Sequence, residues 1–159
     1  MHKLNKIYTL LLLILVLTSC GFKPIYKTNE NNFENSSYSI KFNNNPSYII
    51  QNKILETYNV SSADSFYTIL LSVNQASTPL ITNTNGTVSK YRVEIEVYFD
   101  VNETVSNKKV YSDVARGFDE YLVQTSEIET DEKLKQAVEI ATHEAVQMMS
   151  IKIQSNLLQ

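Results

Sequence analysis

The single cysteine of the chain, Cys20, is the residue whose chemistry and surroundings stand out most clearly. A lone cysteine can be a small buried hydrophobe or a site of covalent modification. Immediately before it, residues 10–17 read LLLLILVL, and residues 1–9 contain Lys3 and Lys6 but no acidic side chain. A bilayer-spanning helix needs about 20 apolar residues, so this run of eight is too short to cross a membrane as a permanent helix. The order of basic, apolar and small residues therefore predicts a secretory leader over residues 1–19.

The residues around the cysteine favour covalent modification. The segment Leu17-Thr18-Ser19-Cys20-Gly21 resembles the lipobox of bacterial lipoproteins, in which the cysteine becomes the acylated first residue of the mature chain. One acyl chain anchors a protein only marginally, whereas two or more anchor it stably. The resemblance therefore implies attachment to a membrane through acyl chains on Cys20. The uncharged Gly21, in place of an aspartate, favours the outer membrane.

The composition of the remaining chain indicates one domain, no general attraction to nucleic acid and no internal disulfide. Removing residues 1–19 leaves 140 of the 159 residues, enough for one domain with one core. Loss of Lys3 and Lys6 leaves 12 basic residues against 17 acidic ones, a net charge of −5. We therefore expect no general attraction to nucleic acid. With Cys20 as the anchor, no disulfide can form within the mature chain.

Other residue types that could do chemistry are sparse. His143 is the only histidine of the predicted mature chain, and no cysteine stands beside it to complete a zinc site. The carboxylate pairs Asp119-Glu120 and Asp131-Glu132 fall at a turn and at a helix start, where capping explains them better than acid–base catalysis. Only three glycines are present, and none forms a phosphate-binding fingerprint. We predict no enzyme, no metal site and no cofactor.

Apolar periodicity predicts the elements of the domain. Residues 20–36 are predicted to be the acylated N-terminus and a polar tether. Alternation predicts strands at residues 37–42, 66–75 and 87–101 and a weaker one at 110–118, where Val110, Val114 and Phe118 recur. A stripe at intervals of four predicts a helix over residues 47–58. A long helix is predicted from residues 127–131 onward, with a buried stripe made by Leu134, Ala137, Val138, Ala141, Ala145 and Met148.

These elements predict the fold class. Strands with one apolar face and helices with one apolar stripe bury both by stacking. We expect residues 37–159 to form one α+β domain, a two-layer sandwich in which two helices pack on one face of an approximately four-stranded mixed sheet, in the order β-α-β-β-β-α. The helical crossover makes the first two strands parallel if they are neighbours, and the last three should form an antiparallel meander.

The chain resembles the family of the LPS-assembly lipoprotein LptE, the partner of the outer-membrane barrel LptD. The resemblance rests on Cys20-Gly21-Phe22-Lys23-Pro24-Ile25-Tyr26, on Asn85-Gly86-Thr87-Val88-Ser89-Lys90-Tyr91 and on the order of the elements. It implies a lipid-anchored protein of the outer membrane that faces the periplasm or lies within the barrel lumen. There it would plug the barrel, help to assemble it and contact lipopolysaccharide. A free-standing periplasmic lipoprotein that binds another envelope ligand, such as peptidoglycan, is the alternative.

The polar face of the strand over residues 87–101 supplies the candidate contacts. Lys90 and Arg92, joined by Arg116 from the next strand, could donate hydrogen bonds to the phosphates of lipopolysaccharide. The alternative is a solvated face whose opposite charges balance. A barrel lumen is polar, so a plug must present hydrophilic surfaces to it. The candidates for this partner interface are Glu94, Glu96, Tyr98 and Tyr111.

Overall fold

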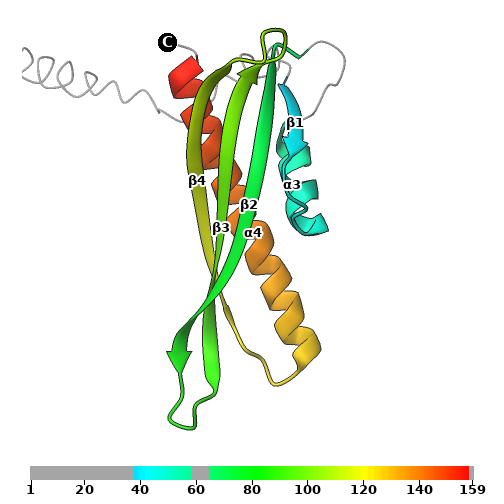
Figure 1. Ribbon diagram of the computed structural model, residues 1–159. Helices are drawn as coiled ribbons and strands as arrows, with labels where there is room; N and C mark the ends of the chain where they lie inside the picture. Colours follow the sequence, from blue (N-terminus) through cyan, green and yellow to red (C-terminus); the bar gives the residue numbers. More distant parts are fainter. Residues whose placement is uncertain (1–37, 59–64, 158–159) are drawn as a thin grey trace, which may run out of the picture. The chain divides into compact units, whose positions relative to one another are not determined.

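The computed structural model describes residues 38–58 and 65–157, all within one compact unit (Figure 1). The predicted leader, the tether and Cys20 lie outside these residues. In chain order the elements are β1 (Tyr38–Phe42), α3 (Tyr48–Tyr58), β2 (Tyr67–Thr82), β3 (Val88–Glu103), β4 (Lys109–Leu122) and α4 (Glu127–Leu157). The prediction of an α+β fold with this order is confirmed.

One mixed sheet contains the strands in the order β1-β2-β3-β4. β1 pairs with β2 in parallel, with Tyr38 opposite Tyr67. The other two pairs are antiparallel, as a meander requires, and Val97 lies opposite both Val73 and Ala115. The prediction that the crossover helix makes the first two strands parallel is therefore confirmed.

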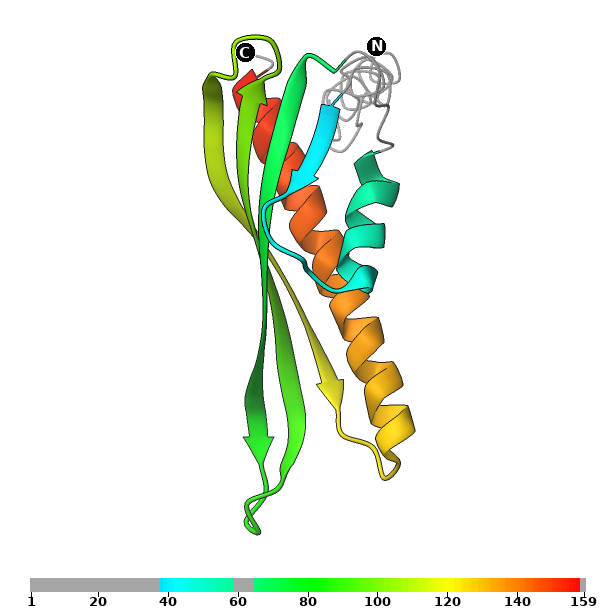
Figure 2. The same ribbon diagram turned by 45° about the vertical axis from the view of Figure 1, so that its right-hand side comes forward.

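Both helices cover the same face of this sheet (Figure 2). β3 supplies the centre of the core, because its odd-numbered residues from Val93 to Val101 point toward the helices and are almost completely buried. α4 packs along β4 and β3, and α3 packs against α4. The hydroxyl of Tyr58 in α3 lies 2.8 Å from the hydroxyl of Ser150 in α4 and joins the two helices. Among the described helices, none combines the length and apolarity needed to cross a bilayer.

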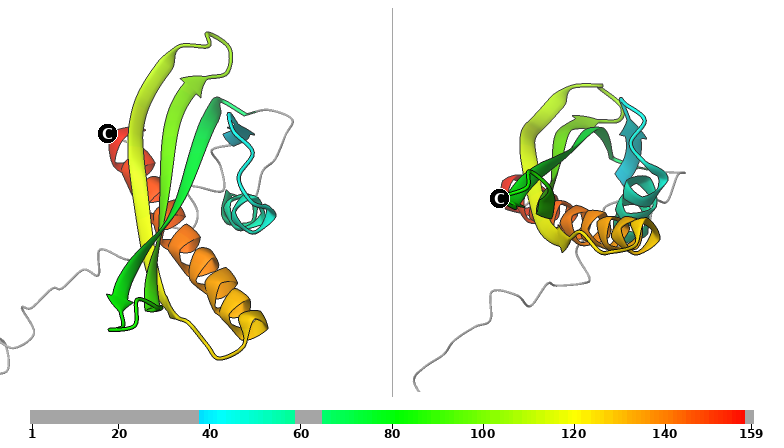
Figure 3. Two further views of the ribbon diagram at one scale, coloured as in Figure 1. Left: turned by 60° about the horizontal axis from the view of Figure 1, so that its bottom comes forward. Right: turned by 90° about the horizontal axis from the view of Figure 1, so that it is seen from below.

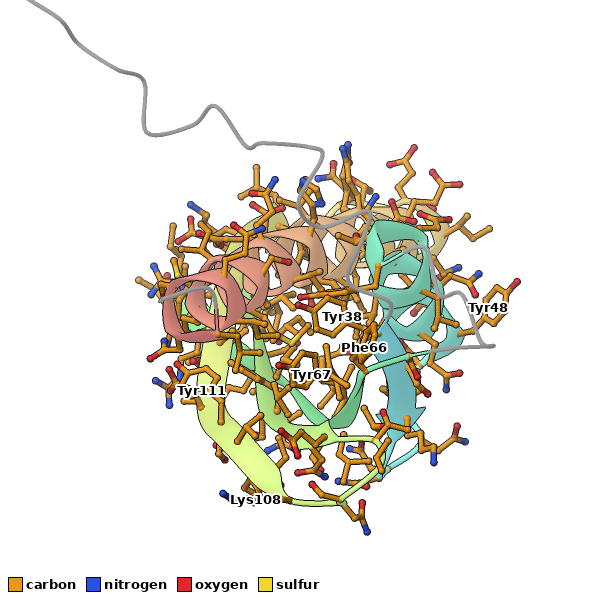
Figure 4. All side chains as sticks on the ribbon, turned by 90° about the horizontal axis from the view of Figure 1, so that it is seen from above. Tyr38, Tyr48, Phe66, Tyr67, Lys108 and Tyr111 are labelled. Atoms are coloured by element: carbon orange, nitrogen blue, oxygen red, sulfur yellow. The ribbon has the colours of Figure 1, made fainter. Side chains whose placement is uncertain are left out.

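Aromatic side chains fill the end of the core beside β1. Figure 4 shows Tyr38 and Tyr67 between the sheet and the helices, whereas Tyr48 projects outward from α3. The rings of Tyr38 and Tyr67 are stacked with centroids 6.0 Å apart, and Tyr58 meets Tyr38 edge-on at 6.5 Å. This cluster fixes the short β1 strand and α3 to the rest of the core.

A glycine allows α4 to approach the sheet closely. A Cβ atom on Gly117 of β4 would lie 2.0 Å from the backbone oxygen of Ala141 and 2.6 Å from the backbone nitrogen of Ala145. Because Gly117 has no side chain and the facing helix residues are alanines, the backbones of α4 and β4 come into direct contact. This contact sets the distance between the two layers.

One detail of the helix prediction is wrong. The helical stripe reaches Met149, which is fully buried, whereas Met148 is 42% exposed. α4 packs against α3 as well as against the sheet, and its buried residues also include Thr142 and Val146. On β4 the apolar residues Val110, Val114 and Phe118 lie on the sheet face away from the helices, since they do not share the phase of buried Ala115.

β2 is also longer than predicted. It continues past residue 75 to Thr82, through Pro79, and pairs with β3 across a bulge between Pro79 and Ile81. The turn that joins β2 to β3 lies at residues 83–87, where Gly86 takes φ 84° and the N–H of Asn83 donates to the C=O of Thr87. Every side chain from residue 74 to residue 87 is exposed. The hairpin extends beyond the start of α4 (Figures 1 and 2), and in the left view of Figure 3 it diverges from the start of that helix.

Candidate functional site

The sheet face opposite the helices carries the predicted site residues. Alternation along β3 places its even-numbered residues there, and the register with β4 adds Arg116, Phe118 and Glu120. We call this surface, from residue 90 to residue 100 of β3 and from 112 to 120 of β4, the outer face. The structure brings the three predicted cations together on it. The residues are Lys90, Arg92, Glu94, Glu96, Tyr98, Asp100, Ser112, Val114, Arg116, Phe118 and Glu120.

One carboxylate holds two of these cations. Glu120 lies opposite Arg92 across the β3–β4 pair and forms ion pairs with both Lys90 and Arg92, the latter at 2.9 Å. The hydrogen bond from Lys90, followed by that from Arg92, lowers the pKa of the Glu120 carboxyl. Glu120 is therefore ionised at neutral pH and occupies the donors that were expected to bind phosphate.

The third cation is paired in the same way. The Arg116 Nε donates to Glu96 at 2.7 Å, and Glu94 lies 3.7 Å away. The hydrogen bond from Arg116 lowers the pKa of the Glu96 carboxyl, and a second one from the Tyr98 hydroxyl at 3.1 Å lowers it further. Further along the face, Asp100 pairs with Lys109 at 2.7 Å.

The outer face is therefore electrically balanced. Its three predicted lipopolysaccharide donors face Glu94, Glu96 and Glu120, so their charges sum to zero. Exposed pairs of this kind contribute little to stability, but together with the pair of Asp100 and Lys109 they leave the face polar without a net charge. The opposite charges of this face are therefore paired with one another.

Apolar groups interrupt the charged rows. Phe118 is 43% exposed and, with Arg92, Asp119 and Glu120, lines an open hollow of about 430 Å³. Tyr98 is 42% exposed, as expected for an interface residue. Aromatic residues among paired charges are typical of contact surfaces between proteins.

Tyr111 does not belong to the outer face. It lies opposite Val101, packs against the core and meets the ring of Phe99 at 5.7 Å, so it points toward the helices. Burial, followed by the hydrogen bond to Asp113, raises the pKa of its hydroxyl. Of the four candidates for the partner interface, Tyr111 therefore lies on the helix side of the sheet, apart from Glu94, Glu96 and Tyr98.

Sequence analysis did not predict that side chains cover the free edge of β4. Lys152 of α4 donates to Asp113 at 2.9 Å and to the C=O of Val114 at 2.8 Å. Asp113 also accepts the N–H of Val114, and Glu144 of α4 accepts the N–H of Phe118 at 2.7 Å. Side chains thus occupy edge groups that would otherwise pair with another strand. No local motif signals these contacts, since residues 113 and 152 are distant in sequence.

The ion pair at this edge predicts a pH dependence of stability. The hydrogen bond from Lys152 lowers the pKa of Asp113 from 3.8 to about 2. A lowered carboxyl pKa stabilises the fold above the unfolded value, and this contribution is lost as the pH falls through the folded value. We expect Asp113→Asn to lower the free energy of unfolding by about 1 kcal/mol, reduced from the full linkage value because the pair is partly exposed.

Urea unfolding of the two proteins from pH 7 to pH 2 checks this prediction. The difference between wild type and Asp113→Asn should be constant above about pH 4 and should shrink toward pH 2. Asp119→Asn is the control, since Asp119 forms no ion pair among the described residues. A difference that does not change with pH would contradict the assignment.

The remaining candidates for chemistry stay apart in the structure. His143 is exposed on α4, and within the described part of the chain its one hydrogen bond is with Gln147, at 2.9 Å. Across residues 38–58 and 65–157, no three His, Cys, Asp or Glu side chains come close enough to hold a metal ion.

Comparison with known proteins gives a fold rather than a family. No protein-family model and no curated protein matches the sequence. Rare lipoprotein B from Shewanella oneidensis has TM-score 0.60 and 14% identity, with 77% of this chain and 97% of that chain covered. A minor lipoprotein from Acinetobacter baumannii has TM-score 0.58 and 12% identity, with 77% and 92% covered.

A third solved structure is similar to the same degree. An uncharacterized lipoprotein B from Nitrosomonas europaea has TM-score 0.58 and 13% identity, with 77% of this chain and 83% of that chain covered. At such identities the likeness shows the fold alone. The described domain therefore has a fold that several bacterial lipoproteins share.

Proposed function

We propose that this chain is a non-enzymatic lipoprotein of the outer membrane that plugs an LptD-like barrel, helps to assemble it and so serves lipopolysaccharide transport to the cell surface. Three observations support the proposal. The fold is that of bacterial lipoproteins, one of them named rare lipoprotein B. The sequence around Cys20 resembles a lipobox. The outer face fits the requirements of a plug.

The balanced outer face carries the argument. The lumen of a large outer-membrane barrel is polar, so a plug needs a hydrophilic surface. It also needs its charges paired, because charge that is desolvated on docking is costly when it has no partner. Glu120 already satisfies Lys90 and Arg92, and Glu96 satisfies Arg116. Tyr98 and Phe118 add aromatic surface for contact.

Isolation of the complex from membranes tests the proposal. The tagged full-length chain is extracted in mild detergent, purified, and run on gels with and without heating. The expected result is a large protein in stoichiometric amount whose mobility changes with heat, as barrels do. The chain recovered alone would contradict the proposal and favour the free-standing lipoprotein.

Contact with lipopolysaccharide requires an anion to compete with the carboxylates of the outer face. We propose that phosphates of the lipid reach Arg92 and Lys90 by displacing Glu120, which bonds to both. Replacing the carboxylate by an uncharged group removes this competition and leaves the backbone unchanged. Glu120→Gln should therefore bind lipopolysaccharide more tightly, by about threefold or more.

Binding of purified lipopolysaccharide to the detergent-solubilised chain measures this effect. Glu94→Gln is the matched control, because it removes the same charge from the same face but lies beside Arg116, at 3.7 Å. Equal affinities for wild type, Glu120→Gln and Glu94→Gln would show that Lys90 and Arg92 are not the contact.

A further inference from the structure

The two edges of the sheet differ in how far their backbone groups are covered. β1 covers the edge of β2 only as far as Leu71, whose C=O accepts the N–H of Asn43 at 2.7 Å. The side chain of Asn44 then takes the place of one more residue of β1. Its Nδ2 donates to the C=O of Val73 at 2.7 Å, and its Oδ1 accepts the N–H of Val73 at 3.1 Å.

Beyond Val73 no described residue covers the edge of β2. The N–H and C=O groups of alternate residues point to the same side of a strand, so the groups of Gln75 and Ser77 point outward like those of Leu71 and Val73. Among the described residues none pairs with them, and both side chains are exposed. Pro79, which has no N–H, and the following bulge end this stretch.

The open edge lacks the usual protection against pairing. Strand edges are normally blocked by charged side chains, prolines, bulges or covering elements. On β4, side chains of Glu144, Lys152 and Asp113 fulfil this role. Residues 74–89, in contrast, contain no charged side chain. We therefore regard the open stretch, residues 74–78, as a binding edge.

We propose that residues 74–78 of β2 accept an extended, uncharged segment of another protein as an additional strand, in line with β1. This is strand addition, in which backbone hydrogen bonds supply the affinity. The absence of charge from residues 74–89 selects an uncharged segment, since a charged one would lose hydration without gaining a partner. The proposal goes beyond the proposed function, because it requires no particular barrel or lipid.

A second copy of the chain would gain less from this edge than a foreign strand. In a two-fold antiparallel pair centred on Ala76, Gln75 of each copy would face Ser77 of the other. The next outward positions, Val73 and Pro79, would add no hydrogen bond, because Asn44 already bonds to Val73 and Pro79 has no N–H. A foreign strand is not limited to this register and can also donate to the C=O of Pro79.

Amide exchange on the full-length chain in detergent tests the proposal. The probe is a capped heptapeptide of alternating threonine and valine at millimolar concentration. Residue-resolved NMR should show exchange at Gln75 and Ser77 slowed by about tenfold or more at saturation. The amides of Asn74 and Ala76, which point toward β3, and those of Val114 and Phe118, whose outward side is covered at β4, should not change.

Two controls make the result specific to backbone pairing. The same peptide with every amide N-methylated should not slow exchange, because it cannot donate. Ser77→Pro removes an edge N–H that bonds to no described residue, and it should abolish the slowing at Gln75. The N-methylated peptide keeps the test decisive even if the proline variant does not fold.

Three results would overturn the proposal. Exchange at Gln75 and Ser77 could remain unchanged at saturating peptide. It could slow equally with the N-methylated peptide, which would indicate contact without strand addition. It could also slow without any peptide as protein concentration and apparent mass rise together, which would identify a second copy as the occupant.

Discussion

Replacing Gly117 by alanine is expected to lower the free energy of unfolding by about 3 kcal/mol, the largest loss we expect from one added methyl group. The new Cβ would lie 2.0 Å from the oxygen of Ala141 and 2.6 Å from the nitrogen of Ala145. Both are backbone atoms, so no change of rotamer relieves the clash and α4 must move away from β4. Urea unfolding followed by circular dichroism measures the loss.

Gly86→Ala is the matched control. The same methyl group meets nothing within 4 Å there, and the only cost comes from the backbone, which has φ 84°. Left-handed backbone at a residue other than glycine costs about 1 kcal/mol. Equal losses for the two variants would show that the approach of α4 to β4 does not limit the packing.

Replacing Cys20 by alanine is expected to move most of the protein from the membrane fraction to the soluble fraction. The thiol that would carry the acyl chains is lost, and each buried methylene of such a chain contributes about 0.8 kcal/mol to anchoring. Among the described helices none can span a bilayer in its place. Fractionation of cells, followed by immunoblotting, measures the change, and the mass of the mature N-terminus reports acylation directly.

Ser19→Ala is the control for this variant, since it keeps a small residue before the cysteine and should leave the protein in the membrane fraction. A Cys20→Ala protein that remains in the membrane after a carbonate wash would contradict lipid anchoring at this position. In that case the association would have to come from another part of the chain or from a partner.

Strong periodicity made most of the fold predictable. Along β3 the buried residues Val93, Ile95 and Val97 alternate with polar ones, a pattern that only a half-buried strand produces. The helical stripe of α3 was equally clear, with Ile50, Ile54 and Tyr58 all buried as expected. A helix between two strands then predicted the parallel pair of β1 and β2.

The errors occurred where neighbouring elements, rather than local patterns, decide burial. The stripe of α4 includes Met149, and α4 packs against α3 as well as against the sheet. β2 continues through Pro79 because the missing N–H faces an edge that no described strand occupies, so proline costs no ladder hydrogen bond there.

The candidate site was predicted as a set of residues but not as a set of interactions. Alternation placed Lys90, Arg92 and Glu94 on one face, and the structure agrees. Which carboxylate meets which cation depends on the register of β4, which pairs Arg92 with Glu120 and Glu96 with Arg116. A shift of one residue would send these side chains to the other face, and the mixed sequence of β4 does not fix that register by itself.

The paired charges also determine how the outer face responds to ionic strength. Because Glu120 and Glu96 neutralise their cations locally, the field of this face falls off within a short distance, and docking there would release few counterions. Long-range attraction would then contribute little to the rate of encounter. Association through this surface should therefore vary little with salt concentration.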